Sequence, residues 1–402
     1  MRKNLNAKFS SVSVYQMQAS KKAKHAKRAF HSLTGECIEH FIYLFGIECN
    51  CICSIDMRTG NIDIQIGDDY EPVYKENLYI KSISYKKNIY FISDRGNAIL
   101  KFNPITNKKQ YLYFEDIAMD YIPVLNNANL ILLPVGYSEK LVQIDLENSR
   151  ISYLPVNYRS NLIANILGEP YIFGSAIVVN QCCYRGSYVG PYIQKFHMDS
   201  GNFEYIKVKD FNHTIKNITF DGSCFWILSY DDGTLVCWDE ITNKIVFMLD
   251  LAKETKKQQM TYAECRYHDG IIYILEEKGS CIIEIDIKEK TLCCFDCTQI
   301  SNFELKGQSR QAFSEFIKID ESGTIYFLPY QSNGVVSKSK AGNIQFYLTE
   351  NNKVLEFAGE QQQNENICTL CDFSEIIQKT NPKKTGQADS GQLILNRIAE
   401  IL

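Results

Sequence analysis

The chain has 402 residues, 45% of them hydrophobic and 22% charged, with a formal net charge of −4 at pH 7. This length and apolar content are typical of one large domain with a substantial core. The sequence has no run of 18 apolar residues and no apolar stretch of the secretory type near its start, so we expect neither membrane insertion nor export.

The first segment of the chain is basic. Residues 1–35 contain eight Lys and Arg residues and no Asp or Glu, which gives +8 there and −12 for the remainder. We expect residues 1–36 to form a basic extension that contacts an acidic polymer, membrane headgroups or the folded part of the chain itself. Its Lys-rich part lacks the interleaved aromatic residues that stack on bases, so we expect no nucleic-acid partner.

A β-rich unit then recurs about every 47 residues between Glu39 and Leu348. Each copy has a turn, an apolar run of strand type, a second apolar run and another polar turn. The first apolar runs of the seven copies are Ile42–Leu44, Ile89–Phe91, Leu130–Leu132, Ile177–Val179, Phe225–Ile227, Ile272–Ile274 and Ile325–Phe327.

Residues that tolerate a positive φ precede most of these runs, as tight hairpins require. Examples are Asn127, Gly174 and the pair Asp269-Gly270. The second apolar run of six copies ends at a polar corner, and the corner residues are Asp56, Asn103, Asp145, His197, Asp239 and Asp286.

Each unit therefore predicts a four-stranded antiparallel meander, and radial stacking of such sheets buries their faces. The sequence predicts an all-β protein, a seven-bladed β-propeller over residues 37–357, with short N- and C-terminal extensions. Six blades are the alternative, because the first unit lacks an obvious innermost strand. Residues Lys353–Phe357 could supply one from the other end, and this strand exchange would close the ring.

The C-terminal extension, residues 358–402, is expected to be a polar linker followed by a short amphipathic helix. Its apolar face is expected to consist of Leu393, Ile394, Leu395, Ile398, Ile401 and Leu402. Such a helix would dock on the propeller or on a partner.

Fifteen cysteines, an odd number, favour a reducing compartment, so we expect a cytoplasmic protein. Cys49, Cys51 and Cys53 alternate along one expected strand and are interpreted as core residues, with a three-thiolate site as the alternative. Cys368 and Cys371, spaced C-x-x-C, form the pair we would test for metal. One such pair does not make a structural zinc site, so no metal and no cofactor are predicted.

Two corner segments carry a family resemblance. Asp56–Asn61 and Asp239–Lys244 resemble the D-x-x-T-G/N corner of quinoprotein-like bacterial propeller repeats, and Trp238-Asp239 resembles the signature of WD40-like repeats. The tryptophan docking motif of quinoproteins is missing, and so is the Gly-His partner of WD repeats. The resemblance implies an uncharacterised bacterial β-propeller of no specific family, in which function depends on sites rather than on the fold.

The sequence lacks the nucleophile-elbow, phosphate-loop, zinc-protease and calcium-loop motifs, so no catalytic residue is assigned. A ligand of a propeller binds where the innermost strands begin. The residues expected there are Tyr79, Tyr121, Glu169, His213, Tyr262, Glu264, Arg266 and Glu315.

Aromatic rings mixed with charges suit a sugar or a peptide, because rings stack while charged groups fix orientation. The alternative is that the tyrosines fill the channel and form hydrogen bonds with one another. We expect a non-catalytic cytosolic module for a protein or saccharide partner. A glycan- or peptide-acting enzyme, with Glu264 or Glu169 and a tyrosine as acid–base residues, is the second hypothesis. The sequence does not set the oligomeric state.

Overall fold

The structure is a computed structural model, and the segments that it describes cover most of the expected propeller. They are residues 32–46, 51–67, 79–93, 98–115, 121–134, 140–155, 173–188, 190–230, 232–255, 262–276, 281–300, 317–328 and 334–348. The expected C-terminal helix, the pair Cys368 and Cys371, and Lys353–Phe357 lie outside these segments.

Seven sheets of four antiparallel strands make up the fold, and each sheet uses four consecutive strands. Blades 1 to 4 contain β1 (Ser32–Ile38), β2 (Phe41–Gly46), β3 (Cys51–Asp56), β4 (Ile62–Gly67); β5 (Tyr79–Tyr85), β6 (Asn88–Ser93), β7 (Ala98–Asn103), β8 (Lys108–Tyr113); β9 (Tyr121–Asn126), β10 (Asn129–Pro134), β11 (Lys140–Asp145), β12 (Arg150–Pro155); and β13 (Phe173–Val179), β14 (Cys182–Ser187), β15 (Tyr192–His197), β16 (Asn202–Lys207). Blades 5 to 7 contain β17 (Ile215–Phe220), β18 (Phe225–Ser229), β19 (Thr234–Asp239), β20 (Lys244–Asp250); β21 (Tyr262–His268), β22 (Ile271–Glu276), β23 (Cys281–Asp286), β24 (Thr291–Asp296); and β25 (Ile317–Ile319), β26 (Ile325–Phe327), β27 (Gly334–Lys338), β28 (Ile344–Leu348).

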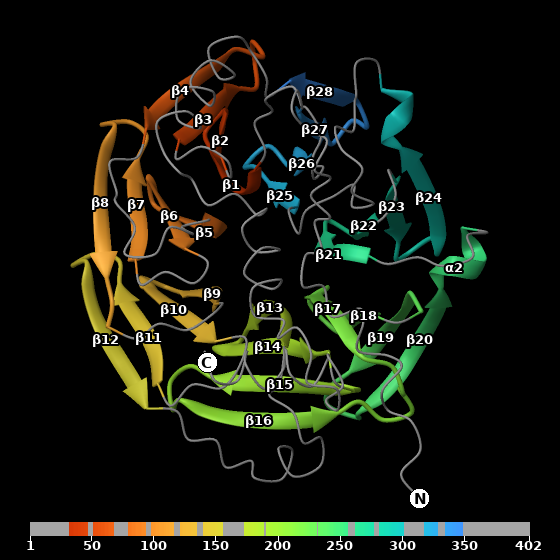
Figure 1. The fold of residues 1–402 in the computed structure, drawn as a ribbon. Coiled ribbons are helices and arrows are strands. Elements are labelled where there is room, and N and C mark those ends of the chain that lie inside the picture. The colour runs from red at the N-terminus through yellow and green to blue at the C-terminus, as the bar shows by residue number, and fades with distance from the viewer. Residues whose placement is uncertain are drawn as a thin grey trace, which may run out of the picture.

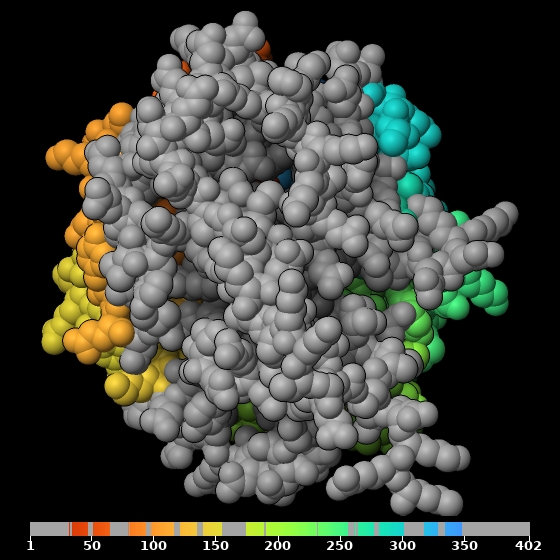
Figure 2. All heavy atoms as spheres, viewed as in Figure 1, coloured from red at the N-terminus to blue at the C-terminus, as the bar shows by residue number. Residues whose placement is uncertain are grey.

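The sheets are arranged radially, with the first strand of each nearest the centre and the fourth at the periphery (Figure 1). This confirms the seven-bladed β-propeller. In the space-filling view, the outer strands of blades 2 and 3 and those of blades 5 and 6 are exposed at opposite edges of the molecule (Figure 2). Within the described segments, helix is limited to α2 (Leu251–Glu254) and a 3-10 turn at Cys297–Gln299.

The polar residues singled out in the sequence form the turns. Asp269 and Gly270 have φ of 46° and 84° between β21 and β22, the left-handed geometry of a two-residue hairpin. The acidic corners are Asx turns. Asp145 Oδ1 accepts hydrogen bonds from the backbone N–H groups of Glu147 and Asn148, at 2.9 and 3.1 Å. The repeated Asp is therefore explained by its hydrogen bonds to nearby backbone N–H groups rather than by ligand binding.

The core consists of seven apolar clusters, one at each junction between neighbouring blades. At the junction of blades 4 and 5, Tyr184 packs against Phe225, with ring centroids 4.5 Å apart, and the cluster includes fully buried Trp238. Burying one large apolar side chain contributes about 1.5–3 kcal/mol. A single blade offers no such burial, so the stability of each blade depends on its neighbours.

Two expectations are corrected by the strand assignment. Blade 1 has its own innermost strand, β1, which begins at Ser32 within the segment expected to be extension, so the described ring needs no strand exchange. The seven first apolar runs were expected at the same place in their units, but Ile177–Val179 belongs to innermost β13, whereas the other six runs lie in second strands. The hairpin turn of the fourth unit is at Asn180 and Gln181. The true second strand, β14, was missed because its sequence, Cys-Cys-Tyr-Arg-Gly-Ser, contains no β-branched apolar run.

Candidate functional site

Antiparallel pairing divides the propeller into two ends. In each blade the first and third strands begin, and the second and fourth end, at the same end of the ring, which we call the upper end. The turns between first and second strands, such as Asp269-Gly270, lie at the lower end. Within the described segments, the predicted binding residues lie on innermost strands or directly before one. Most of them are at the upper end.

A group of five residues, which we call the rim cluster, lies at the upper end of blades 4 and 5: Tyr188, His213, Lys216, Tyr230 and Asp232. The rings of Tyr188 and Tyr230 have centroids 5.3 Å apart at an interplanar angle of 60°. Lys216 Nζ lies 5.6 Å and 5.3 Å from these two centroids. The Lys216 residue is only 4% exposed, so its cation–π contacts form in a largely desolvated place, where they are strongest.

The other two members of the rim cluster form a polar pair. His213 Nδ1 lies 3.3 Å from Asp232 Oδ2, and both side chains are about two-fifths exposed, at 37% and 41%. Burial alone would raise the pKa of Asp232, but hydrogen bonds from Ser229 and Thr234 and the nearby His213 outweigh it and lower that pKa. Asp232 is therefore a carboxylate at neutral pH, placed to orient the imidazole of His213.

Backbone features place these side chains. The pairing of β17 with β18 shifts register between Ile215 and Asn217, which makes Lys216 the extra residue of a β-bulge. The backbone N–H of Tyr230 donates to the carbonyl of Thr214 at 3.0 Å, which ties the loop after β18 to the segment that enters β17. Both segments of the rim cluster in blade 5 are thus fixed to each other.

Two charged residues predicted for the channel form an ion pair on the innermost strand of blade 6. Glu264 on β21 accepts a hydrogen bond from Arg266 Nη2 at 2.7 Å, and the Glu264 side chain is 6% exposed. The pKa of Arg266 is raised, chiefly by the charge of Glu264. Both residues were predicted to lie in the channel, and the structure brings them together. A carboxylate paired in this way is poorly suited to act as an acid or base.

The other predicted residues are distributed differently. Tyr79, Tyr121 and Tyr262 are at most 2% exposed and pack in the clusters between blades. Tyr79 packs on Phe45 with ring centroids 4.5 Å apart. Glu169 and Glu315 lie outside the described residues. The structure therefore leaves the side chains of His213 and Arg266 partly exposed, whereas Glu264 and the three tyrosines are buried.

Sequence reasoning missed four members of the rim cluster. Tyr188, Lys216, Tyr230 and Asp232 were not among the predicted binding residues. The available signal was positional: Tyr188 and Tyr230 each follow directly after a second strand, at equivalent places in adjacent blades. That signal depended on the correct placement of β14, which the β-branched run in β13 obscured.

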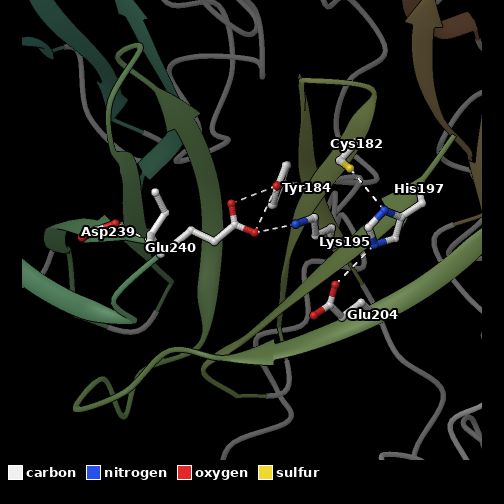
Figure 3. A network of polar contacts seen from close by, with 8 residues as sticks. Cys182, Tyr184, Lys195, His197, Glu204, Asp239 and Glu240 are labelled. Carbon is white, nitrogen blue, oxygen red and sulfur yellow. Dashed lines mark hydrogen bonds and ion pairs between the residues drawn. The ribbon is translucent and has the colours of Figure 1, made fainter.

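A second polar network lies at the lower end of blades 4 and 5 (Figure 3). Glu240, after β19, accepts hydrogen bonds from Tyr184 Oη at 3.0 Å and from Lys195 Nζ at 2.7 Å. Burial raises the pKa of Tyr184 to about 12. Next to these contacts of Glu240, a line of contacts across β14, β15 and β16 is formed by Cys182, His197 and Glu204 (Figure 3).

A cleft of about 540 Å³ lies at the lower end of the junction between blades 7 and 1. Its walls include His40, Arg58, Asp320 and Tyr347. Asp320 Oδ1 already accepts hydrogen bonds from the backbone N–H groups of Ser322 and Thr324, at 2.8 and 2.9 Å. Asp320 thus holds the turn that follows β25.

The cysteines in the described segments are not joined in disulfides, and most of them are buried. Cys51 and Cys53 lie in the core between blades 7 and 1, as interpreted from their alternation, whereas Cys293 and Cys294 on β24 are exposed. Across the described ranges, no group of three or more His, Cys, Asp or Glu side chains is arranged to hold a metal ion. Nor does any helix there have the length and apolarity to cross a membrane.

Comparison with known proteins supports the fold. No family model matches the sequence, and no curated protein matches it. A streptogramin B lyase structure has a TM-score of 0.58 at 11% identity, over 80% of this chain and 95% of that chain. A catalytically inactive histidine-to-alanine variant of virginiamycin B lyase from Staphylococcus aureus, with quinupristin, gives 0.57 at 9% identity, over 78% and 96%. The structure of U3-55K gives 0.51 at 12%, over 77% and 88%.

Proposed function

We propose that this chain is a non-catalytic β-propeller that binds a protein or saccharide partner through the rim cluster. The observation that carries this proposal is the convergence of two tyrosine rings, a desolvated lysine and the His213–Asp232 pair at one place on the upper end. Small-molecule and peptide sites combine aromatic surface with a few fixed polar groups, and the rim cluster supplies both.

The chemistry of the cluster favours a neutral or weakly charged partner with an apolar face. The rings of Tyr188 and Tyr230 can stack on a sugar face or on an apolar side chain, while Asp232 accepts hydrogen bonds from hydroxyl or amide groups. We propose the cytoplasm as the location, because none of the twelve cysteines in the described segments is joined in a disulfide.

The test is a screen of the purified chain against glycan and peptide arrays, followed by hydrogen exchange of the chain with and without the selected ligand. We expect ligand-dependent protection in segments 182–188 and 211–230. Protection confined to the lower-end turns, or the absence of any selected glycan or peptide, would contradict the proposal.

A second candidate function is enzymatic, and the His213–Asp232 pair favours it. A carboxylate that orients an imidazole is the arrangement of a general base. A lyase of similar fold is inactive when a histidine is replaced by alanine, so propellers of this shape can use a histidine in catalysis.

Mass spectrometry of the selected ligand after incubation with the chain separates the two candidates. An enzyme would convert the ligand and would lose this activity on His213→Ala. Unchanged ligand would contradict the enzymatic candidate and leave the binding function intact.

A further inference from the structure

Three side chains in blade 4 form a thiol–imidazole–carboxylate line at the lower end. Cys182 Sγ lies 3.4 Å from His197 Nδ1, and His197 Nε2 lies 3.3 Å from Glu204 Oε2 (Figure 3). Cys182 is half-buried, while the His197 and Glu204 side chains are 36% and 55% exposed. A reagent in solvent therefore has access to the imidazole side of the thiol.

The strand register produces this line. Cys182 on β14 is directly opposite His197 on β15, so their side chains lie on the same face of the sheet. Glu204 on β16 is opposite Lys195, two residues before His197, which makes Glu204 a diagonal neighbour of His197 on that face. The arrangement is therefore set by pairing within one sheet and does not depend on a loop.

The order of the groups assigns their chemical roles. A thiol next to a ring nitrogen can pass its proton to that nitrogen, and a carboxylate on the other nitrogen fixes the tautomer and stabilises the imidazolium that forms. This is the nucleophile, base and orienting group of covalent catalysis. We propose that Cys182 is a thiol-modification site that exchanges with small-molecule disulfides, with His197 as its base and Glu204 as the positioning residue.

In the exchange, Cys182 Sγ gives its proton to His197 Nδ1 and forms a bond to one sulfur of the disulfide R–S–S–R. The disulfide bond breaks, and the leaving thiolate takes up the proton held by His197. The products are Cys182–S–S–R and R–SH, so Cys182 is oxidised and the reagent is reduced. No further oxidant is needed.

The surroundings of Cys182 explain why a base is required. Burial raises the pKa of the Cys182 thiol, although the charge of Lys195 opposes this effect, so the thiol is protonated at neutral pH. The thiolate is the attacking species in disulfide exchange. Transfer of the proton to His197 supplies it at the moment of attack.

Modification would also affect the junction of blades 4 and 5. Cys182 and Tyr184 are two residues apart on β14, so both project from the same face. A group attached to Cys182 would lie beside the contact of Tyr184 with Glu240, which joins the two blades.

The test uses the full native chain and glutathione disulfide as the probe, with rates of modification at individual cysteines followed by mass spectrometry after alkylation. We expect modification of Cys182 in the parent chain and a loss of its rate by roughly tenfold or more in His197→Gln, which keeps hydrogen bonding but cannot serve as a base. Glu204→Gln should reduce the rate less. The exposed Cys293 serves as an internal control, and its rate should stay unchanged in both variants.

An unmodified Cys182 in the parent chain would overturn the proposal. So would equal rates at Cys182 in the parent chain and His197→Gln. If the modification rate of Cys293 also changed in His197→Gln, that substitution would have altered the fold. Glu204→Gln would then decide the outcome. The proposal requires that this variant slow modification of Cys182 and leave the rate at Cys293 unchanged.

Discussion

Lys318 on β25 forms an ion pair with Glu36 on β1, across the junction of the last and first blades. The Glu36 side chain is 5% exposed, and it also accepts a hydrogen bond from Ser82 Oγ on β5 at 2.9 Å. One buried carboxylate thus links the inner strands of blades 7, 1 and 2. Since each described blade consists of consecutive strands, side-chain contacts rather than a shared strand join blade 7 to blade 1.

Removal of one partner of this ion pair should therefore lower the stability of the fold. Lys318→Met leaves the buried carboxylate of Glu36 without its ion-pair partner, and we expect a loss of about 3 kcal/mol in the free energy of unfolding. Lys86→Met is the matched control, because Lys86 and Glu147 form a pair whose side chains are 63% and 50% exposed. Its loss of stability should be much smaller, because solvent screens an exposed ion pair. Urea denaturation of both variants makes the comparison, and equal losses would contradict the role assigned to Glu36.

A close approach of backbone to backbone fixes blade 4 against blade 5. A Cβ atom added at Gly174 would lie 2.1 Å from the carbonyl oxygen of Lys216 on β17. We expect Gly174→Ala to lower the free energy of unfolding by about 1–3 kcal/mol through forced separation of the two strands, and to disturb the rim cluster.

Gly60→Ala is the control for that substitution. Gly60 has φ of 73° and no atom within 4 Å of an added Cβ, so only backbone strain opposes the alanine. Thermal unfolding of the two variants separates the effects. A Gly174→Ala protein as stable as the parent chain would show that blades 4 and 5 are farther apart than described.

The lowered pKa of Asp232 makes a pH-dependent contribution to stability. Its ordinary value is 3.8, and the folded value is lower because Ser229 and Thr234 donate to the ionised form and His213 lies nearby. The contribution is present above the unfolded pKa and is lost as pH falls through the folded pKa. We expect the parent chain to be more stable than Asp232→Asn at pH 6, with the difference shrinking below pH 3.8. A difference that stays constant down to pH 2 would contradict this assignment.

Sequence patterns predicted the local features well, because these depend on neighbours in the chain. Asp269-Gly270 forms the expected hairpin turn. Asp145 forms the expected corner by accepting hydrogen bonds from the backbone of residues that follow it directly. The blade count followed from the repeat of these signals. The innermost strand of blade 1 was missed because Ser32–Ile38 has no apolar run and follows directly after the basic segment.

The rim cluster shows the limit of such reasoning. Tyr188 and Lys216 come from different blades, and their contact depends on the spacing of two sheets rather than on any motif. The tyrosines expected in the channel, such as Tyr79, start innermost strands, but their rings turn into the junctions between blades, where apolar burial is greatest. Position along a strand was predictable, whereas the direction of the side chain relative to the channel was not.

The most direct measurement of the central claim is the dissociation constant of the selected ligand for Tyr230→Ala, compared with that for Tyr113→Ala. Tyr230 belongs to the rim cluster, whereas Tyr113 is a tyrosine on outer strand β8, 54% exposed and remote from the upper end of blade 5. We expect Tyr230→Ala to weaken binding by at least roughly tenfold, about 1.4 kcal/mol, while Tyr113→Ala binds as the parent chain does. Equal affinities for Tyr230→Ala and the parent chain would contradict the assignment of the rim cluster as the binding surface.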